Sequence, residues 1–312
     1  MNITVNTIFS DCFQQFSEKC LVQLSEDEIF KYEGQLYHYT SLENFKMMID
    51  NGSILATSIY MMNDPNELKN DYEKILKIFF GRFLNNGQYA RKYDDIYTFP
   101  AFVFSLTEHE DSMYFWDKYG NNHKGIRIGF NPEAIINYWK VLGDISVVLV
   151  PVIYKKDDSN YVGKYSKYFI EFKNELFSKL NTYYETNEIT DSDKDNLSYY
   201  AALISSMIKM EYWRVEEEWR IICNTGGYVY DKIVGVISNG IPTARLKNDS
   251  EKTLSIFTNT GQGNIASKNI LKIGSLAGNK DYIEYFIKLL FKSKTKTNFY
   301  NDVLTQSKIE IR

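Results

Sequence analysis

The chain switches repeatedly between two hydrophobic periodicities, and this alternation limits its possible folds more than any other feature. Residues 99–107 (FPAFVFSLT) are rich in residues typical of strands, and residues 111–120 (DSMYFWDKYG) fit a short helix. Residues 125–130 (GIRIGF) then alternate like a strand again. Because helix and strand patterns are interleaved without an internal repeat, we expect an α+β fold.

Similar patterns predict the other elements of the domain. Strands are expected at 34–41, 53–62, 147–154, 213–224, 232–238 and 269–276, and helices at 42–51, 68–79, 164–181, 196–211 and 281–293. Residues 1–30 are interpreted as an N-terminal helical lead-in. We interpret residues 31–312 as a single domain with a helical insertion near 160–212, because no Pro/Gly/Ser-rich linker divides them.

Composition excludes few function classes, but it makes some of them less plausible than others. The net charge is −4, which disfavours a general phosphate-neutralising surface for nucleic acid. The chain contains 25 Tyr and 20 Phe, more rings than a core needs, so some are expected to line a cleft. No stretch reaches the roughly 18 apolar residues of a membrane span, and no signal peptide is recognisable. A cytoplasmic location without membrane association is therefore expected.

Three cysteines, Cys12, Cys20 and Cys223, lack a CxxC spacing and share no dense neighbourhood with the histidines. This pattern disfavours a disulfide framework and a zinc site. We expect buried, reduced thiols and no bound metal.

A histidine stands at the end of the strand predicted at 34–41. His38 and Thr40 are two residues apart, so both side chains lie on the same side if the strand continues. An imidazole and a hydroxyl in this arrangement can bind the ribose hydroxyls of a nucleotide. The alternative is that His38 is a core histidine with satisfied hydrogen bonds and Thr40 a helix cap.

The segment from Glu216 to Ile221 combines charge with strand periodicity. Period two places Glu216, Glu218 and Arg220 on one face. In a cleft, repulsion and desolvation would raise the pKa of one carboxyl group, while Arg220 would hold the other ionised. The alternative is a solvated sheet face with an ordinary ion pair.

Two further segments carry candidate binding residues. Trp116 and Tyr119 are three residues apart on the helix predicted at 111–120, so their rings can lie side by side and stack on a flat heterocycle, or simply form core. His123, in the following turn, is either a polar contact or a surface histidine. Asn63-Asp64-Pro65-Asn66-Glu67 has the composition of a turn and a helix start, and capping alone would explain it.

Five short motifs occur in an order that resembles a bacterial family, domain of unknown function twenty-nine seventy-one. They are L-Y-H-Y-T-S at 36–41, N-D-P-x-E at 63–67, F-S-L-T-E at 104–108, W-x-x-Y-x-x-x-H-x-G at 116–125 and W-x-x-E-x-E-W-R at 213–220. The resemblance covers roughly residues 35–290, and its specificity lies in the combined order and spacing.

At a greater distance, the layout is similar to the ADP-ribosyltransferase superfamily of the His-Tyr-Glu type. That resemblance implies a split, mixed or antiparallel sheet with flanking helices, and NAD as the substrate. It implies that His38 with Thr40 contacts the nicotinamide-side ribose and that Glu218 stabilises the positive charge formed on that ribose. Tyr119 is the matching aromatic residue, with Trp116 and Tyr114 as alternatives, and Glu216 would help to choose the acceptor.

The resulting site has two groups of residues. Those expected to act on the bond are Glu218, Glu216 and Arg220, and those expected to contact NAD are His38, Tyr39, Thr40, Trp116, Tyr119, His123, Asn63, Asp64 and Glu67. The acceptor of ADP-ribose is a protein, a nucleic acid, a small molecule or water, and the superfamily's habits imply a toxin or an anti-phage defence effector.

Two other function classes stay open from the sequence. A metal-dependent nuclease or hydrolase would use Asp64, Glu67, Glu216 and Glu218 around a divalent cation. A non-catalytic sensor would bind a nucleotide in the same pocket without turnover.

Overall fold

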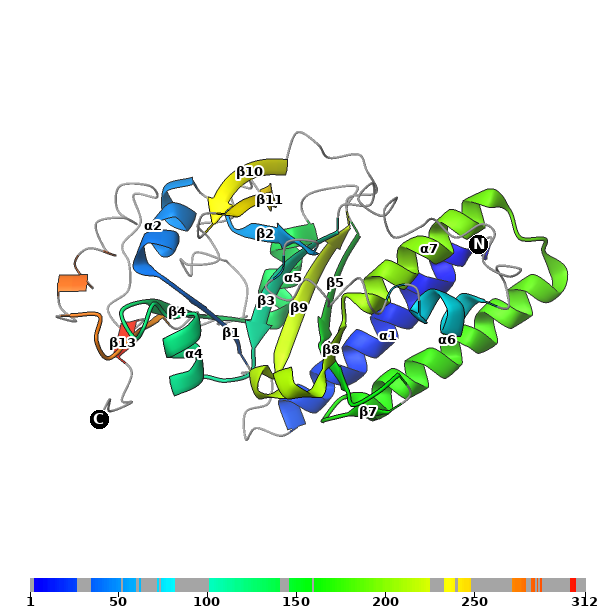
Figure 1. The fold of residues 1–312 in the computed structure, drawn as a ribbon, viewed down its shortest axis with the longest axis horizontal. Coiled ribbons are helices and arrows are strands. Elements are labelled where there is room, and N and C mark those ends of the chain that lie inside the picture. The colour runs from blue at the N-terminus through cyan, green and yellow to red at the C-terminus, as the bar shows by residue number, and fades with distance from the viewer. Residues whose placement is uncertain are drawn as a thin grey trace, which may run out of the picture.

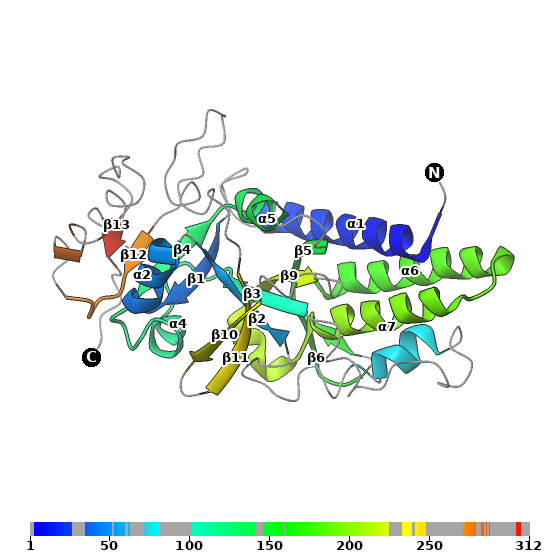
Figure 2. The same ribbon diagram turned by 90° about the horizontal axis from the view of Figure 1, so that it is seen from above.

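A computed structural model of the chain was analysed (Figures 1 and 2). It describes residues 3–26, 35–51, 53–59, 62, 72, 74–81, 101–140, 146–158, 160–224, 233–238, 241–247, 271–278, 282–283, 285, 287 and 304–306. Within these ranges the fold is α+β, with antiparallel and mixed sheets flanked by helices, as the alternating periodicities predict. No helix among the described residues is long and apolar enough to cross a membrane.

The larger sheet is built around two long central strands. Its main path runs β10 (Ile233–Ser238), β11 (Ile241–Lys247), β2 (Leu55–Ser58), β3 (Ala101–Thr107), β1 (Leu36–Thr40), β4 (Ile126–Phe130), β12 (Leu271–Ile273) and β13 (Leu304–Gln306). β9 (Glu218–Asn224) pairs with β3 along its whole length, and β5 (Ser146–Pro151) pairs with β9. All these pairings are antiparallel except that of β12 with β13.

The sheet splits at β3, and this split positions the site. β9 occupies one edge of β3. The other edge is shared, because β2 pairs near the start of β3, with Thr57 opposite Val103, whereas β1 pairs near its end, with Tyr37 opposite Thr107. β1 and β2 therefore belong to two diverging wings, and backbone groups of β3 between them need other hydrogen-bond partners.

The residues after β5 build two long helices and a small second sheet. β6 (Ile153–Lys155) pairs with β7 (Tyr161–Val162) and with β8 (Ile208–Met210). The N-terminal helix α1 (Val5–Glu26) packs against both α6 (Ser166–Thr186) and α7 (Asp191–Ser205) (Figures 1 and 2). The predicted helices at 164–181 and 196–211 are thus present, but the second ends at Ser205 and residues 208–210 are a strand.

Two strand predictions are wrong in detail. The single strand predicted at 147–154 is divided between two sheets: β5 ends at Pro151 and pairs with β9, whereas β6 begins at Ile153 and pairs with β7 and β8. The strand predicted at 213–224 begins only at Glu218, because residues 211–216 form a 3-10 turn and Glu217 adopts a left-handed conformation with φ 36°.

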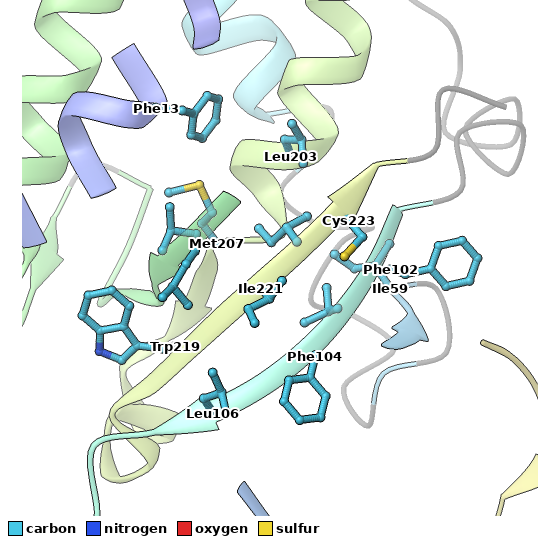
Figure 3. Close-up of a cluster of buried hydrophobic side chains, with 14 of the residues drawn as sticks. Phe13, Ile59, Phe102, Phe104, Leu106, Leu203, Met207, Trp219, Ile221 and Cys223 are labelled. Atoms are coloured by element: carbon cyan, nitrogen blue, oxygen red, sulfur yellow. The ribbon is translucent and has the colours of Figure 1, made fainter. Parts of the chain in front are cut away.

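The core lies where β3 and β9 meet the helices. Phe104 and Leu106 of β3 face Ile221 and Trp219 of β9 as register partners (Figure 3), and all four side chains are buried. Phe13 of α1 joins the same core from the helical side. Burying such large apolar side chains stabilises the fold by roughly 1.5–3 kcal/mol each, so the apolar residues of β9 contribute directly to the core.

Helices cover the wings of the sheet. α2 (Leu42–Asn51) begins at the predicted place, and the Ser41 hydroxyl accepts a hydrogen bond from the Asn44 amide as a cap. α4 (Met113–Lys118) joins β3 to β4, as the interleaved pattern predicts. α5 (Pro132–Lys140) was not predicted, although Ile135, Tyr138 and Trp139 form its buried face.

Candidate functional site

A pocket of about 650 Å³, measured with its open mouth, lies beside the split in the sheet. Its walls come from β1, β3, α4, β8, the 3-10 turn Glu211–Glu216 and β9, and are formed by Tyr37, His38, Tyr39, Met62, Ser105, Leu106, Thr107, Phe115, Tyr119, Lys209, Trp213, Glu216 and Glu218. The histidine and the carboxylates from opposite halves of the chain thus share one cavity.

His38 is fixed at the divergence of the two wings. Its Nδ1 lies 3.0 Å from the carbonyl oxygen of Ser105, and its ring packs against Phe104 with centroids 4.5 Å apart. A carbonyl oxygen only accepts, so Nδ1 carries the proton in this contact, and the neutral tautomer with this proton has Nε2 as an acceptor. A neutral imidazole in a pocket wall is suited to bind a hydroxyl group.

Glu218 is held from behind by a buried guanidinium. Arg220 donates from Nε to Oε1 of Glu218 at 2.9 Å and from Nη2 to Oε2 at 3.1 Å. Arg220 also donates to the Ser206 carbonyl, and it is fully buried. This bidentate pair fixes the plane of the Glu218 carboxylate in the pocket wall.

Glu216 lies at the centre of a second set of contacts. Its Oε1 accepts hydrogen bonds from the Tyr119 hydroxyl at 2.7 Å, the Tyr114 hydroxyl at 3.1 Å and the Lys118 ammonium at 3.1 Å. Its Oε2 lies 3.0 Å from Nζ of Lys209, which also lies 2.7 Å from Oε2 of Glu218. One lysine therefore bridges the two carboxylates.

These cations keep both carboxylates ionised. Burial opposes ionisation of Glu218, but the charges of Arg220 and Lys209 outweigh it and lower its pKa to about 2. Burial likewise opposes ionisation of Glu216, yet the Lys209 charge and the Tyr119 hydrogen bond lower its pKa below the ordinary value. The expectation that one carboxyl group would have a raised pKa is wrong, because it did not include Lys209.

The two interpretations of the acidic segment can now be separated. A solvated sheet face is excluded, because Glu216, Glu218 and Arg220 are all buried. The shared-face prediction holds for Glu218 and Arg220 on β9. It is wrong for Glu216, which precedes the strand and reaches the same cluster from the end of the 3-10 turn.

The aromatic residues in and directly after α4 lie partly in the core and partly in the pocket wall. Tyr119 lines the pocket and packs against Phe115 with centroids 5.7 Å apart. Trp116 is fully buried, packs edge-on against Tyr39 and donates its indole N–H to Asp111 at 2.7 Å. Trp116 is therefore core, as the alternative to a stacking role proposes.

The turn after α4 is anchored by its histidine. Asn121, Asn122 and His123 all have left-handed φ angles, between 51° and 64°. His123 is buried, and its Nε2 lies 2.9 Å from the Asp117 carboxylate. Close to it, a Cβ atom at Gly125 would come within 2.2 Å of the Thr40 carbonyl oxygen. This part of the motif at 116–125 serves the turn rather than the pocket wall.

The remaining predicted residues have varied places. Tyr39 lines the pocket, but its hydroxyl lies 3.0 and 2.9 Å from the backbone carbonyl oxygens of residues 109 and 110, one of which can accept its proton. Thr40 is buried and is not among the lining residues. Asn63, Asp64 and Glu67 lie outside the described residues.

Among the pocket and rim residues that were not predicted, Lys209, Trp213 and Lys118 carry chemistry. Lys209 stands alone in an apolar stretch and carries no periodic signal. Trp213 and Lys118 belong to quoted segments, but only the structure brings them together, with the Lys118 ammonium 4.1 Å from the Trp213 ring centroid. The W-x-x-E spacing from Trp213 to Glu216 was the one usable signal.

The comparisons with known proteins point to one family. A family model described as "Protein of unknown function (DUF2971)" matches residues 115–221, from α4 through α6 and α7 to β9. This match supports the family resemblance found in the motifs, and its range contains Tyr119, Lys209, Glu216 and Glu218. No curated protein and no solved structure matches the chain.

Proposed function

We propose that this protein binds NAD in the pocket and cleaves the bond between nicotinamide and ribose, passing ADP-ribose to an acceptor or to water. The observation that carries the proposal is that His38 of β1 and Glu218 of β9 line the same aromatic cavity. Spatial convergence of these two residues is what a transferase of the His-Tyr-Glu type would require.

The chemistry needs an anion near the reacting carbon. When the bond from ribose C1′ to the nicotinamide nitrogen breaks, the bonding electrons leave with nicotinamide, which becomes neutral. Positive charge then develops on the ribose, and a hydroxyl or amine of the acceptor adds to C1′ and releases its proton. A carboxylate preorganised beside that ribose lowers the barrier electrostatically. Glu218, ionised and held by Arg220, suits this role.

The other pocket residues suit binding. Tyr119 presents an aromatic ring, and burial together with the nearby Glu216 raises the pKa of its hydroxyl, so it stays a hydrogen-bond donor. Trp213 offers a second ring for a flat heterocycle. The imidazole of His38 would hydrogen-bond the ribose, and such positioning contributes to the rate by fixing the reacting geometry.

The carboxylate geometry favours this proposal over a metal-dependent hydrolase. Glu216 and Glu218 are joined by the ammonium group of Lys209, at 3.0 and 2.7 Å. A divalent cation shared by these two carboxylates would compete with that ammonium group for the same oxygens. A nucleotide sensor without turnover would use the same pocket and differs only in the outcome of an assay.

The test is incubation of purified protein with NAD labelled in the adenylate, with and without cell lysate and with EDTA throughout; a parallel set omits EDTA. We expect label in free ADP-ribose, in protein or in nucleic acid, and the labelled fraction identifies the acceptor. Intact NAD in all arms would refute the proposal. Bound but intact NAD would assign the sensor function, and turnover that EDTA abolishes would assign a metal-dependent reaction.

A further inference from the structure

Lys209 holds an unusual position for a lysine. Its side chain is about nine-tenths buried on β8, and its ammonium group contacts carboxylate oxygens of both Glu216 and Glu218. The same ammonium group lies 5.4 Å from the centroid of the Trp213 ring. A buried lysine costs free energy unless its charge is paired, and here it is paired twice.

We propose that Lys209 is a positioning residue of this site: its ammonium group bridges Glu216 and Glu218 and holds both side by side as charged acceptors in the pocket wall. Two carboxylates brought into one buried cluster repel each other. A cation between the two carboxylates attracts both of them, and these two attractions offset the repulsion. The role is distinct from that of Arg220, which contacts Glu218 and the Ser206 carbonyl.

The charged and titratable groups around the pair come from several elements. Lys118 and Tyr114 of α4, and Tyr119 directly after the helix, contact Glu216. From β9, Arg220 contacts Glu218, and from β6 the Tyr154 hydroxyl accepts a hydrogen bond from the Glu218 amide. Lys209 of β8 forms an ion pair with each of the two carboxylates, which makes it the bridge between these two sets of contacts.

The experiment measures the carboxylates directly, without NAD. Carbon-13 NMR of protein labelled at the glutamate side-chain carboxyls, assigned with Glu216→Gln and Glu218→Gln, reports the titration of each group. In Lys209→Met we expect at least one of the two to titrate higher by roughly one to three pH units. Lys209→Arg, which keeps the charge, should restore most of the original titration. The double variant Lys209→Met/Glu216→Gln should return Glu218 close to its original titration, because one charge of each sign has gone.

Lys155→Met is the matched control. Lys155 is similarly buried on β6, opposite Met210 in the register with β8, but it forms an ion pair with Asp158, outside the pocket. Its replacement should leave both titrations unchanged. Unchanged titrations in Lys209→Met, or an equal shift in Lys155→Met, would overturn the inference. Should Lys209→Met fail to fold, recovery of folding in the double variant supports the proposal and no recovery overturns it.

A separate experiment tests whether Lys209 affects catalysis, and it rests on the proposed function. The acidic limb of the pH profile of nicotinamide release should move upward in Lys209→Met by the same amount as the carboxylate titration. A shifted titration without any NAD cleavage in the wild type would refute the proposed function and keep the role of Lys209. If Glu216 and Glu218 titrate in Lys209→Met as they do in the wild type, the positioning role of Lys209 is refuted, whether or not the variant releases nicotinamide.

Discussion

Glu218 ties function to stability at the level of a single residue. Its carboxylate is the anion that the proposed reaction needs, and it is also the partner of the fully buried Arg220. Removing one member of a buried ion pair leaves the other charge uncompensated. A change at this position therefore affects folding as well as chemistry, which the sequence alone did not indicate.

For Glu218→Gln we expect the free energy of unfolding at pH 7 to fall by about 3 kcal/mol. The pKa of Glu218 is lowered in the folded state to about 2, from an ordinary 4.5. Its contribution is therefore fully present above pH 4.5 and is lost as the pH falls from 4.5 towards 2. Urea unfolding of both proteins between pH 7 and about pH 3 measures this. A difference that does not shrink below pH 4.5 would contradict the ion-pair explanation.

Glu217→Gln provides the comparison, because the neighbouring side chain is about half exposed and its carboxylate lies 3.4 Å from Nε2 of His109. It should change stability by less than about 0.5 kcal/mol.

His38→Ala should weaken NAD binding about tenfold, which corresponds to one lost hydrogen bond of ~1.4 kcal/mol. Isothermal titration calorimetry of the variant and the wild type measures this difference. His109→Ala is the control, since His109 lies outside the pocket lining and contacts the Val215 carbonyl. Equal affinities for the wild type and His38→Ala would remove His38 from the binding site.

Site residues differ in how well the sequence predicts them. His38, Tyr119, Glu216 and Glu218 stand in motifs whose residue types suggest chemistry, and the structure places them in one pocket. Lys209 could not be predicted, because its role depends on how a three-residue strand and the following 3-10 turn fold back on each other.

At the scale of elements, the turn between α4 and β4 concentrates backbone strain. Three consecutive residues, Asn121 to His123, have positive φ angles. Asparagine tolerates this conformation better than most residues, so the two asparagines reduce its cost. The contact of the buried His123 with Asp117 fixes the turn against α4. The pocket residue Tyr119 lies directly between α4 and this turn.

Asn122→Val should lower the free energy of unfolding by about 1–2 kcal/mol, because a β-branched residue is strained at φ 51°. The Asn122 side chain is exposed, so little packing changes. Lys124→Val is the matched control in the same turn, exposed and outside the positive-φ set, and should have a much smaller effect. Equal losses in thermal or urea unfolding would show that the turn conformation is not the cause.

The types of most elements followed from the sequence, and the errors have local causes. The strands at 99–107 and 125–130 were predicted because the first is rich in strand-favouring residues and the second alternates with period two, and the structure has strands there and at the predicted 34–41. The run at 147–154 is mostly apolar, so it gave no sign that β5 ends at Pro151 and that β6 belongs to another sheet. The 3-10 turn before β9 was hidden, because the charged residues continue an apparent alternation through Glu217.

At the scale of the whole molecule, the pocket depends on strand order. β1 and β9 lie on opposite edges of β3, and the split of the sheet on the β1 side opens the cavity. No local pattern encodes which strands become neighbours. The proposed function needs His38 and Glu218 in one pocket, but the sequence motifs alone do not show that the two residues meet. The core that carries this arrangement extends from β9 to α1.

Phe13→Ala should destabilise the entire fold by about 3–5 kcal/mol, because its buried ring packs against Phe172 of α6, with centroids 4.9 Å apart, within the core shared with β9. Gln14→Ala, at the exposed neighbour on the same helix, should change stability by less than about 0.5 kcal/mol. Denaturant unfolding followed by far-UV circular dichroism distinguishes them. A small loss for Phe13→Ala would mean that α1 contributes little to the shared core.

The most direct measurement is the release of nicotinamide from NAD by wild-type protein and by Glu218→Gln, both in EDTA and each corrected for its folded fraction. We expect release by the wild type and a loss of about 10² or more in the variant. Release that continues at the wild-type rate in Glu218→Gln, or no release by the wild type, would contradict the proposed role of the pocket.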